Sequence, residues 1–155
     1  MRTVVIVFCV ALLLSGTACR IPDPTARQTA ELEDIGSSLE DCLARHRGRP
    51  VLIAFIAGWG ATGLGPKYAL NTPEAMEAMR QHHVVPVIAD VTRRRDLFAV
   101  MNREFHRPGP PFIVLYSSDR ARKPFVSEYS TFITERDGKA ASDGMAVARI
   151  IRGYL

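Results

Sequence analysis

The segment Val51-Leu-Ile-Ala-Phe-Ile-Ala-Gly-Trp59, with Gly60-Ala-Thr-Gly63 directly after it, decides how the whole sequence is interpreted. Residues 51–57 form an uninterrupted apolar run between Pro50 and Gly58. Such a run, bounded by residues that interrupt regular structure, is typical of a strand buried on both faces. We therefore expect a central strand that leads into a glycine-rich segment.

Helical and strand-like patterns alternate on both sides of this strand. Apolar spacing and capping residues predict helices over 29–46, 72–82, 96–105 and 145–154. Apolar runs predict further strands over 84–91, 112–116 and 125–132, and a loop over 136–144. This order predicts an α/β fold with a central sheet of about four strands, flanked by helices and closed by an antiparallel edge.

Composition limits the class of protein. The chain has 155 residues, of which 47% are apolar and 23% charged, so it is long enough for one domain with a sizeable core. The net charge of +4 permits contact with an acidic partner or an anionic membrane, but does not indicate nucleic acid. We expect no cofactor. No metal site is expected either, because the histidines lack metal-ligand spacing and suit solvated or helix-end positions. They are His46, His82, His83 and His106.

The N-terminus has the pattern of an export signal. Arg2 precedes the apolar run Val4–Leu14, whose eleven residues are too few to span a bilayer comfortably, and small residues follow. We expect a signal peptide over 1–18, a linker over 19–28 and a single domain over 29–155.

Two processing routes fit a cut after Ala18. Gly16 and Ala18 satisfy the small-x-small rule of ordinary signal peptidase. Cys19 resembles the lipid-modified cysteine of bacterial lipoproteins, although Gly16 stands where that motif usually has leucine. We expect a lipidated Cys19, with simple secretion as the alternative. Without lipidation, a disulfide between Cys19 and Cys42 is possible. Cys42 itself lies on an apolar helix stripe and is expected to be a buried, inert thiol.

The pattern Gly58-x-Gly60-x-x-Gly63 after a strand is also a literal dinucleotide-binding fingerprint, and Asp90 ends the next predicted strand. Pro66 interrupts the helix that should begin inside that motif, and four strands make a thin sheet for a dinucleotide-binding fold. A nucleotide site therefore remains the third hypothesis.

The segment 51–63 resembles the active-site region of the thioredoxin superfamily, in which a strand leads through tryptophan into Cys-x-x-Cys. The resemblance is to the periplasmic C-terminal domain of the DsbD thiol:disulfide interchange protein, and covers about Gly48 to Phe132. Its other matches are Arg49-Pro50-Val51, Thr72-Pro73, Asp90-Val91-Thr92 and Gly109-Pro110-Pro111. The resemblance implies a thioredoxin-like fold and a cis bond before Pro111, facing the site.

The departures from this family determine the expected function. Glycine stands at both cysteine positions, Gly60 and Gly63, and Ala54 stands where the family has a buried acid. Disulfide exchange needs one thiolate to attack and a second thiol to resolve the mixed disulfide, and glycine offers neither.

We therefore expect no catalytic residues, and a binding face made of Trp59, Gly60, Gly63, Pro110 and Pro111. In the family, the cis-proline loop presents its backbone to an extended peptide. The predicted function is a non-catalytic protein- or peptide-binding module in envelope thiol or protein-folding traffic. It would stand on the periplasmic side of a bacterial membrane, anchored by lipid or soluble.

Two further expectations belong to this prediction. The alternative function is a thiol:disulfide oxidoreductase that works through Cys42 or through a partner's cysteines. The basic run Arg93-Arg94-Arg95 best suits a solvated face, and contact with acidic lipid or a partner is its alternative.

Overall fold

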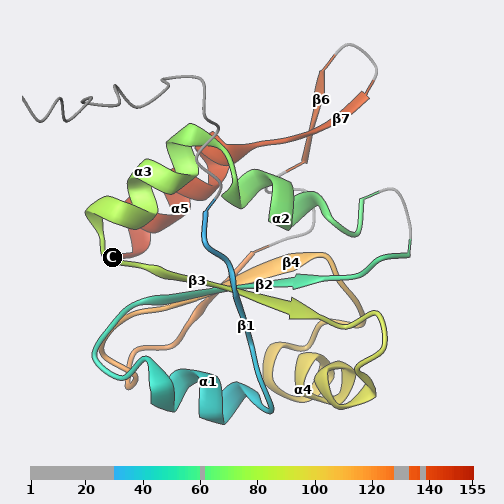
Figure 1. The fold of residues 1–155 in the computed structure, drawn as a ribbon, viewed down its shortest axis with the longest axis vertical. Coiled ribbons are helices and arrows are strands. Elements are labelled where there is room, and N and C mark those ends of the chain that lie inside the picture. The colour runs from blue at the N-terminus through green and yellow to red at the C-terminus, as the bar shows by residue number, and fades with distance from the viewer. Residues whose placement is uncertain (1–29, 60–61, 128–132, 137–138) are drawn as a thin grey trace, which may run out of the picture.

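A computed structural model describes residues 30–59, 62–127, 133–136 and 139–155. It contains a five-stranded sheet in the order β1-β3-β2-β4-β5, flanked by helices on both faces (Figure 1). The strands of this sheet are β1 Glu33–Asp34, β2 Val51–Ile56, β3 Val85–Asp90, β4 Phe112–Tyr116 and β5 Phe125–Val126. The helices are α1 Leu39–Arg45, α2 Gly65–Leu70, α3 Pro73–Gln81, α4 Arg95–Phe105 and α5 Gly144–Tyr154.

Strand β2 is the centre of the sheet, as its apolar run predicts. Every residue of β2 is buried. It pairs in parallel with β3, from Val51 opposite Val85 to Ile56 opposite Asp90. On its other side it pairs antiparallel with β4, with Phe55 opposite Phe112. The predicted antiparallel edge is therefore confirmed.

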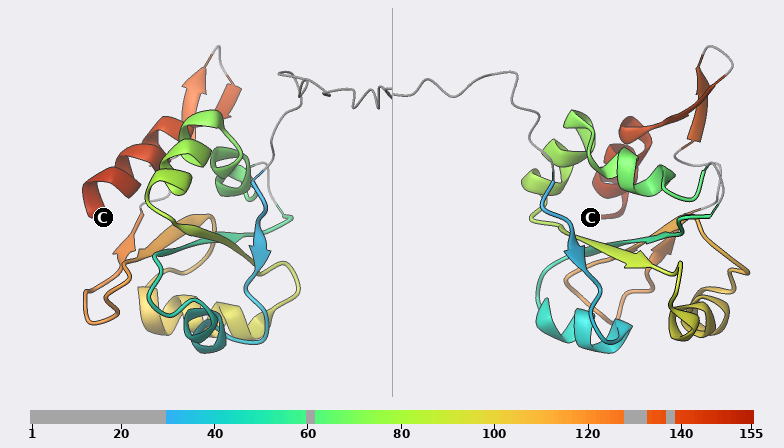
Figure 2. Two further views of the ribbon diagram at one scale, coloured as in Figure 1. Left: turned by 60° about the vertical axis from the view of Figure 1, so that its left-hand side comes forward. Right: turned by 45° about the vertical axis from the view of Figure 1, so that its right-hand side comes forward.

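Alternate side chains of β2 enter two separate cores. Val51, Ile53 and Phe55 pack with α1 and α4 on one face of the sheet. Leu52 and Ala54 pack with α2, α3 and α5 on the other. Figure 2 shows these two helical layers on opposite sides of the sheet. A strand that supplies both cores has no polar position, which is why it reads as a continuous apolar run.

The prediction of one helix over 29–46 is wrong in its first half. Residues 33–34 form the edge strand β1, which pairs in parallel with β3, and the helix begins only at Leu39. Gly36 between them has a φ of +79°, a left-handed conformation that ends regular structure at little cost for glycine. Ser38 then caps α1 by accepting a hydrogen bond from the Asp41 amide. The sheet consequently has five strands, not four.

Two other elements differ from the sequence prediction. The short helix α2 follows the glycine-rich segment, with Pro66 in its first turn, where proline is tolerated. Part of the predicted loop 136–144 is the hairpin of β6 Ile133–Arg136 and β7 Lys139–Ser142. Its second strand contacts α2, and the Ser142 hydroxyl donates to the carbonyl oxygen of Gly65 at 3.2 Å.

The remaining predicted helices and strands are confirmed within a few residues. The exception is the strand over 125–132, of which β5 forms the first two residues and 128–132 lie outside the described residues. The expected signal peptide, linker and lipidated Cys19 also lie outside them. Within the described residues, every helix is too short or too polar to span a lipid bilayer.

Candidate functional site

Three loops meet at one edge of the sheet because of its strand directions. The parallel strands β2 and β3 both end there, and the antiparallel strand β4 begins there. The described parts of the first loop, 57–59 and 62–64, are therefore neighbours of the segments 91–94 and 106–111, on the right of Figure 1. The sequence prediction placed Trp59, Gly63, Pro110 and Pro111 on one face. These loops carry all four, but only Trp59 and Pro110 are accessible, whereas Gly63 and Pro111 are buried. Gly60 lies outside the described residues.

The loop after β2 folds back onto the end of its own strand. The Ala57 amide donates to the carbonyl oxygen of Gly63 at 3.1 Å. A Cβ placed on Gly63 would lie 2.1 Å from the Ala57 carbonyl oxygen and 3.0 Å from that of Trp59. Both obstacles are backbone atoms, so a side chain at this position requires the loop itself to move. Gly63 therefore has a packing role that only glycine meets in this conformation.

A second hydrogen-bonded link ties this loop to the end of β3. The Gly58 amide donates to the hydroxyl oxygen of Thr92 at 2.8 Å. Thr92 in turn donates to the Asp90 carboxylate through its hydroxyl, and through its amide at 2.9 Å. Thr92 thus fixes the start of the loop that carries Trp59. In the sequence, Asp90-Val91-Thr92 is only a family match, which indicates no role for Thr92.

The side chain of Trp59 lies on the surface against α4. It is 48% exposed and stacks on Phe98, with ring centroids 5.8 Å apart and planes 12° from parallel. Phe98 is a site residue that the sequence analysis missed. Its signal was an aromatic side chain placed off the apolar stripe of α4, which runs through Leu97, Met101 and Phe105. The two rings form an aromatic surface beside the loop.

The third loop has the cis bond that the resemblance implied, between Pro110 and Pro111. Pro111 is buried and Pro110 is half-buried. Phe112, the next residue, stacks on Phe55 in the core at 4.7 Å between centroids. Pro111 is therefore continuous with the core, and Pro110 is partly accessible at the surface.

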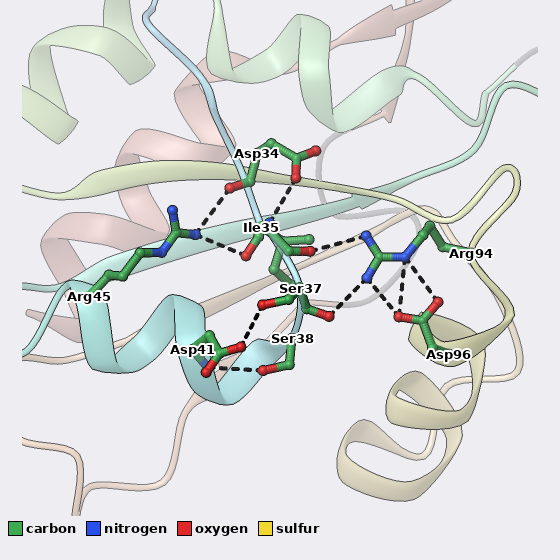
Figure 3. A network of polar contacts seen from close by, with 9 residues as sticks. Asp34, Ile35, Ser37, Ser38, Asp41, Arg45, Arg94 and Asp96 are labelled. Atoms are coloured by element: carbon green, nitrogen blue, oxygen red, sulfur yellow. Dashed lines mark hydrogen bonds and ion pairs between the residues drawn. The ribbon is translucent and has the colours of Figure 1, made fainter.

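Arg94, directly before α4, binds the segment that joins β1 to α1 beside the site. Arg94 donates to the carbonyl oxygens of Gly36 and Ser37, each at 3.1 Å, and pairs with Asp96 at 2.6 Å. On the opposite side of the same segment, Arg45 donates to the Ile35 carbonyl oxygen at 2.9 Å. Figure 3 shows the two arginines on either side of the chain that joins β1 to α1. The N-terminal edge of the domain is thus attached to the loop 91–94.

The thiol outside this face is poorly suited to chemistry. Cys42 is fully buried between α1 and the sheet, as predicted, and burial raises the pKa of its thiol. The thiolate is the reactive form of cysteine, and a raised pKa makes it scarcer at neutral pH. Ala54 is also fully buried and brings no acid to the inside of β2.

The histidines lie at helix ends, as predicted for them, but one is not solvated. His46, His82 and His106 directly follow α1, α3 and α4. His46 is buried and its Nε2 lies 3.1 Å from the Glu33 carboxylate, so it attaches α1 to the edge strand β1. Among the described residues, no three His, Cys, Asp or Glu side chains are placed to hold a metal ion.

A cleft of about 600 Å³ lies elsewhere, at the far end of β4. Tyr116 lines it, and burial raises the pKa of its hydroxyl to about 12. Tyr116 pairs with Val51 at the start of β2, and His106, the first residue of the third loop, also lines this cleft. None of Trp59, Gly63, Pro110 and Pro111 lines it, so the candidate face is a separate surface.

No protein-family model matches this sequence, and no curated protein matches it either. Solved structures do match this chain. The chain is similar to chloroplastic thioredoxin z, with a TM-score of 0.57 and 19% identity over 81% of this chain and 96% of that one. It is also similar to the reduced C-terminal domain of DsbD from Neisseria meningitidis, with a TM-score of 0.49 and 21% identity over 76% of this chain and 90% of that one. At such identities the likeness concerns the fold alone. The fold is thioredoxin-like, as predicted.

Proposed function

We propose that this chain is an exported, non-catalytic binding module that holds an extended protein segment on the face formed by Trp59, Gly63, Pro110 and Pro111. Gly60 belongs to the same proposed face by sequence. The N-terminal pattern supports export, and Cys19 supports attachment to a membrane on the periplasmic side of a bacterial envelope. The proposed role is accessory, in thiol or protein-folding traffic.

The close approach at Gly63 carries this proposal. A thioredoxin-type reaction requires a thiol at each of two positions, here Gly60 and Gly63. The sequence lacks both, and the loop fills the space of the second side chain with the Ala57 carbonyl oxygen, 2.1 Å from where Cβ would lie. A loop relaxed around glycine suits a chain that no longer performs disulfide exchange.

The surface beside Gly63 has two properties of a binding face, an exposed aromatic ring and a fixed backbone. Trp59 offers an exposed aromatic ring, and aromatic side chains contribute much of the energy of protein interfaces. The ring is supported from below by Phe98, and its loop is fixed by Thr92. A preformed surface loses little conformational entropy when a partner binds.

The alternative function, an oxidoreductase that works through Cys42, has little support. Its thiol is fully buried and its pKa is raised, so neither access nor ionisation favours attack on a disulfide. We expect the purified chain to reduce insulin with dithiothreitol no faster than background, and Cys42→Ala to change nothing. Activity above background that Cys42→Ala abolishes would overturn the non-catalytic proposal.

Binding is tested by capture from an envelope extract on the immobilised chain. We expect Trp59→Ala to lose the captured protein and Tyr68→Ala to retain it. Tyr68 on α2 is the control because it is another exposed aromatic residue, 59% exposed, that lies outside the three loops in sequence. Equal capture by both variants, or by neither, would contradict a binding face at Trp59.

A further inference from the structure

We infer that the segment held at this face is acidic, with an apolar side chain placed on Trp59 between carboxylates that pair with Arg93 and Arg95. This inference rests on the proposed function and specifies the chemistry of the partner. It follows from which charges around the aromatic surface are already paired and which are not.

The three consecutive arginines have different surroundings. Arg94 is committed to the fold, because its guanidinium pairs with Asp96 and donates to two carbonyl oxygens of the β1–α1 connection (Figure 3). Arg93 and Arg95 are exposed, and neither side chain has an ion pair or hydrogen bond within the described part of the chain. Arg94 thus anchors the run while its two neighbours remain available.

These two cations lie beside the aromatic surface. The hydrogen bond from Gly58 to Thr92 joins the two loops, and Trp59 and Arg93 are the residues that follow in each. Arg95 is the first residue of α4, and Phe98 is three positions later, so the two share one side of the helix. The stack of Trp59 on Phe98 therefore has basic groups along its border with α4.

The nearby carboxylates do not neutralise them. Asp96 is paired with Arg94, and Asp90, which accepts hydrogen bonds from Thr92, leaves one carboxylate beside the two free guanidinium groups of Arg93 and Arg95. The face therefore combines exposed aromatic area with net positive charge, a surface complementary to an acidic segment with an apolar side chain. Guanidinium groups bind carboxylates through paired hydrogen bonds. The N-terminal end of α4 adds attraction for negative charge in the same place.

The test uses the fluorescence of Trp59, the only tryptophan in the sequence. Short synthetic peptides without tryptophan would be titrated: one of leucine among glutamates, one with glutamine and one with lysine in place of glutamate. We expect the glutamate peptide to shift Trp59 emission and bind at least about fivefold more tightly than the glutamine peptide, and the lysine peptide not to bind. Added salt should weaken the binding.

The matched variants are Arg93→Gln/Arg95→Gln and, as control, Arg47→Gln/Arg49→Gln. The control arginines are also exposed and precede β2, at the other end of the strand from the site. We expect the first pair to weaken binding of the glutamate peptide about fivefold and the control to leave it unchanged. Equal losses in both would show an effect of net charge and overturn the inference.

Two other outcomes would also overturn it. The glutamine peptide binding as tightly as the glutamate peptide would mean that charge is not recognised. A shift of Trp59 emission by phosphatidylglycerol vesicles, with none by the glutamate peptide, would assign the basic border to a membrane. The proposed function is tested separately. A protein that is captured through Trp59, and is still captured by the Arg93→Gln/Arg95→Gln variant, contradicts the acidic partner but not the binding face.

Discussion

Strand β2 and the loop that follows it are adjacent in sequence but are specified in different ways. In β2 every side chain is buried, and each contributes to one of two hydrophobic cores. In the loop the decisive contacts involve backbone atoms, namely the hydrogen bonds of Ala57 and Gly58 and the approach of Gly63 to the Ala57 carbonyl oxygen.

The difference shows where this fold tolerates change. A strand held by apolar area accepts another side chain of similar size, since hydrophobic packing is non-directional. A loop held by close backbone contacts accepts almost no substitution at its tightest point. Substitutions of its solvent-facing side chains should have little effect. Gly63, which the resemblance aligns with a cysteine position, lies at such a tight point, because the Ala57 carbonyl oxygen occupies the space that a side chain would need.

The largest effect should follow removal of an aromatic ring from β2. Phe55 is fully buried, stacks on Phe112 and meets Phe105 edge-on at 5.5 Å. We expect Phe55→Ala to lower the free energy of unfolding by about 4 kcal/mol, measured by urea denaturation. Trp59→Ala in the loop should cost only about 1 kcal/mol, because its ring is half exposed. Similar losses in the two variants would break the distinction between strand and loop.

A smaller effect is expected at Gly63. Adding one methyl group in Gly63→Ala should cost about 2–3 kcal/mol, since backbone atoms must move to admit it. Gly109→Ala is the control, because a Cβ there has no atom within 4 Å, and it should stay within about 0.5 kcal/mol of the parent. We expect Gly63→Cys to cost as much as Gly63→Ala, so introducing a cysteine pair at positions 60 and 63 would also destabilise the domain. An unaffected Gly63→Ala variant would show that the loop is not tight.

The strands and most helices could be predicted because buried positions are mostly occupied by apolar residues. The apolar run of β2 and the capping residue Thr72 of α3 both have a physical meaning that a single sequence displays. The edge strand β1 could not be predicted, because it has only two residues, too few to show an alternation of apolar and polar side chains, and it is held by pairing with β3. The helical spacing that continues through them favoured a longer helix, and the left-handed Gly36 prevents it.

The candidate site was predictable only through a resemblance. The resemblance placed Trp59, Gly63 and the proline pair on one face, and the strand directions bring their loops to the same end of the sheet. Neither the contact of Gly63 with Ala57 nor the stack on Phe98 follows from sequence spacing, because each joins two backbone segments whose relative position depends on the whole sheet. The commitment of Arg94 alone, within three identical residues, is likewise invisible in sequence.

The pH dependence of stability tests whether the Cys42 thiol is shielded from water in the folded state. Burial raises the pKa of the Cys42 thiol above its ordinary value of 9.0, so the folded state keeps the proton that the unfolded chain releases. Stability should therefore be constant below about pH 8 and fall as pH rises through 9, by no more than about 1.4 kcal/mol per pH unit.

Cys42→Ala should flatten that part of the profile, whatever its effect on stability at neutral pH. Tyr116 titrates higher, because burial raises its pKa to about 12, so measurements between pH 8 and 10 isolate the thiol. An identical slope in the variant and the parent would mean that Cys42 ionises as readily in the folded chain as in the unfolded one.

The smallest effect should come from the hydroxyl that links the loop to β3. Thr92→Val keeps the shape of the side chain but removes the acceptor for the Gly58 amide, which is exposed enough to bond water instead. We therefore expect a loss of only about 0.5–1 kcal/mol in urea denaturation, together with a shift of Trp59 emission as the loop loosens. Thr92→Ser retains the hydroxyl and should keep the parent emission. If Thr92→Val leaves the emission unchanged, side-chain packing on Phe98 holds Trp59, and the loop resembles the strand more than the backbone contacts suggest.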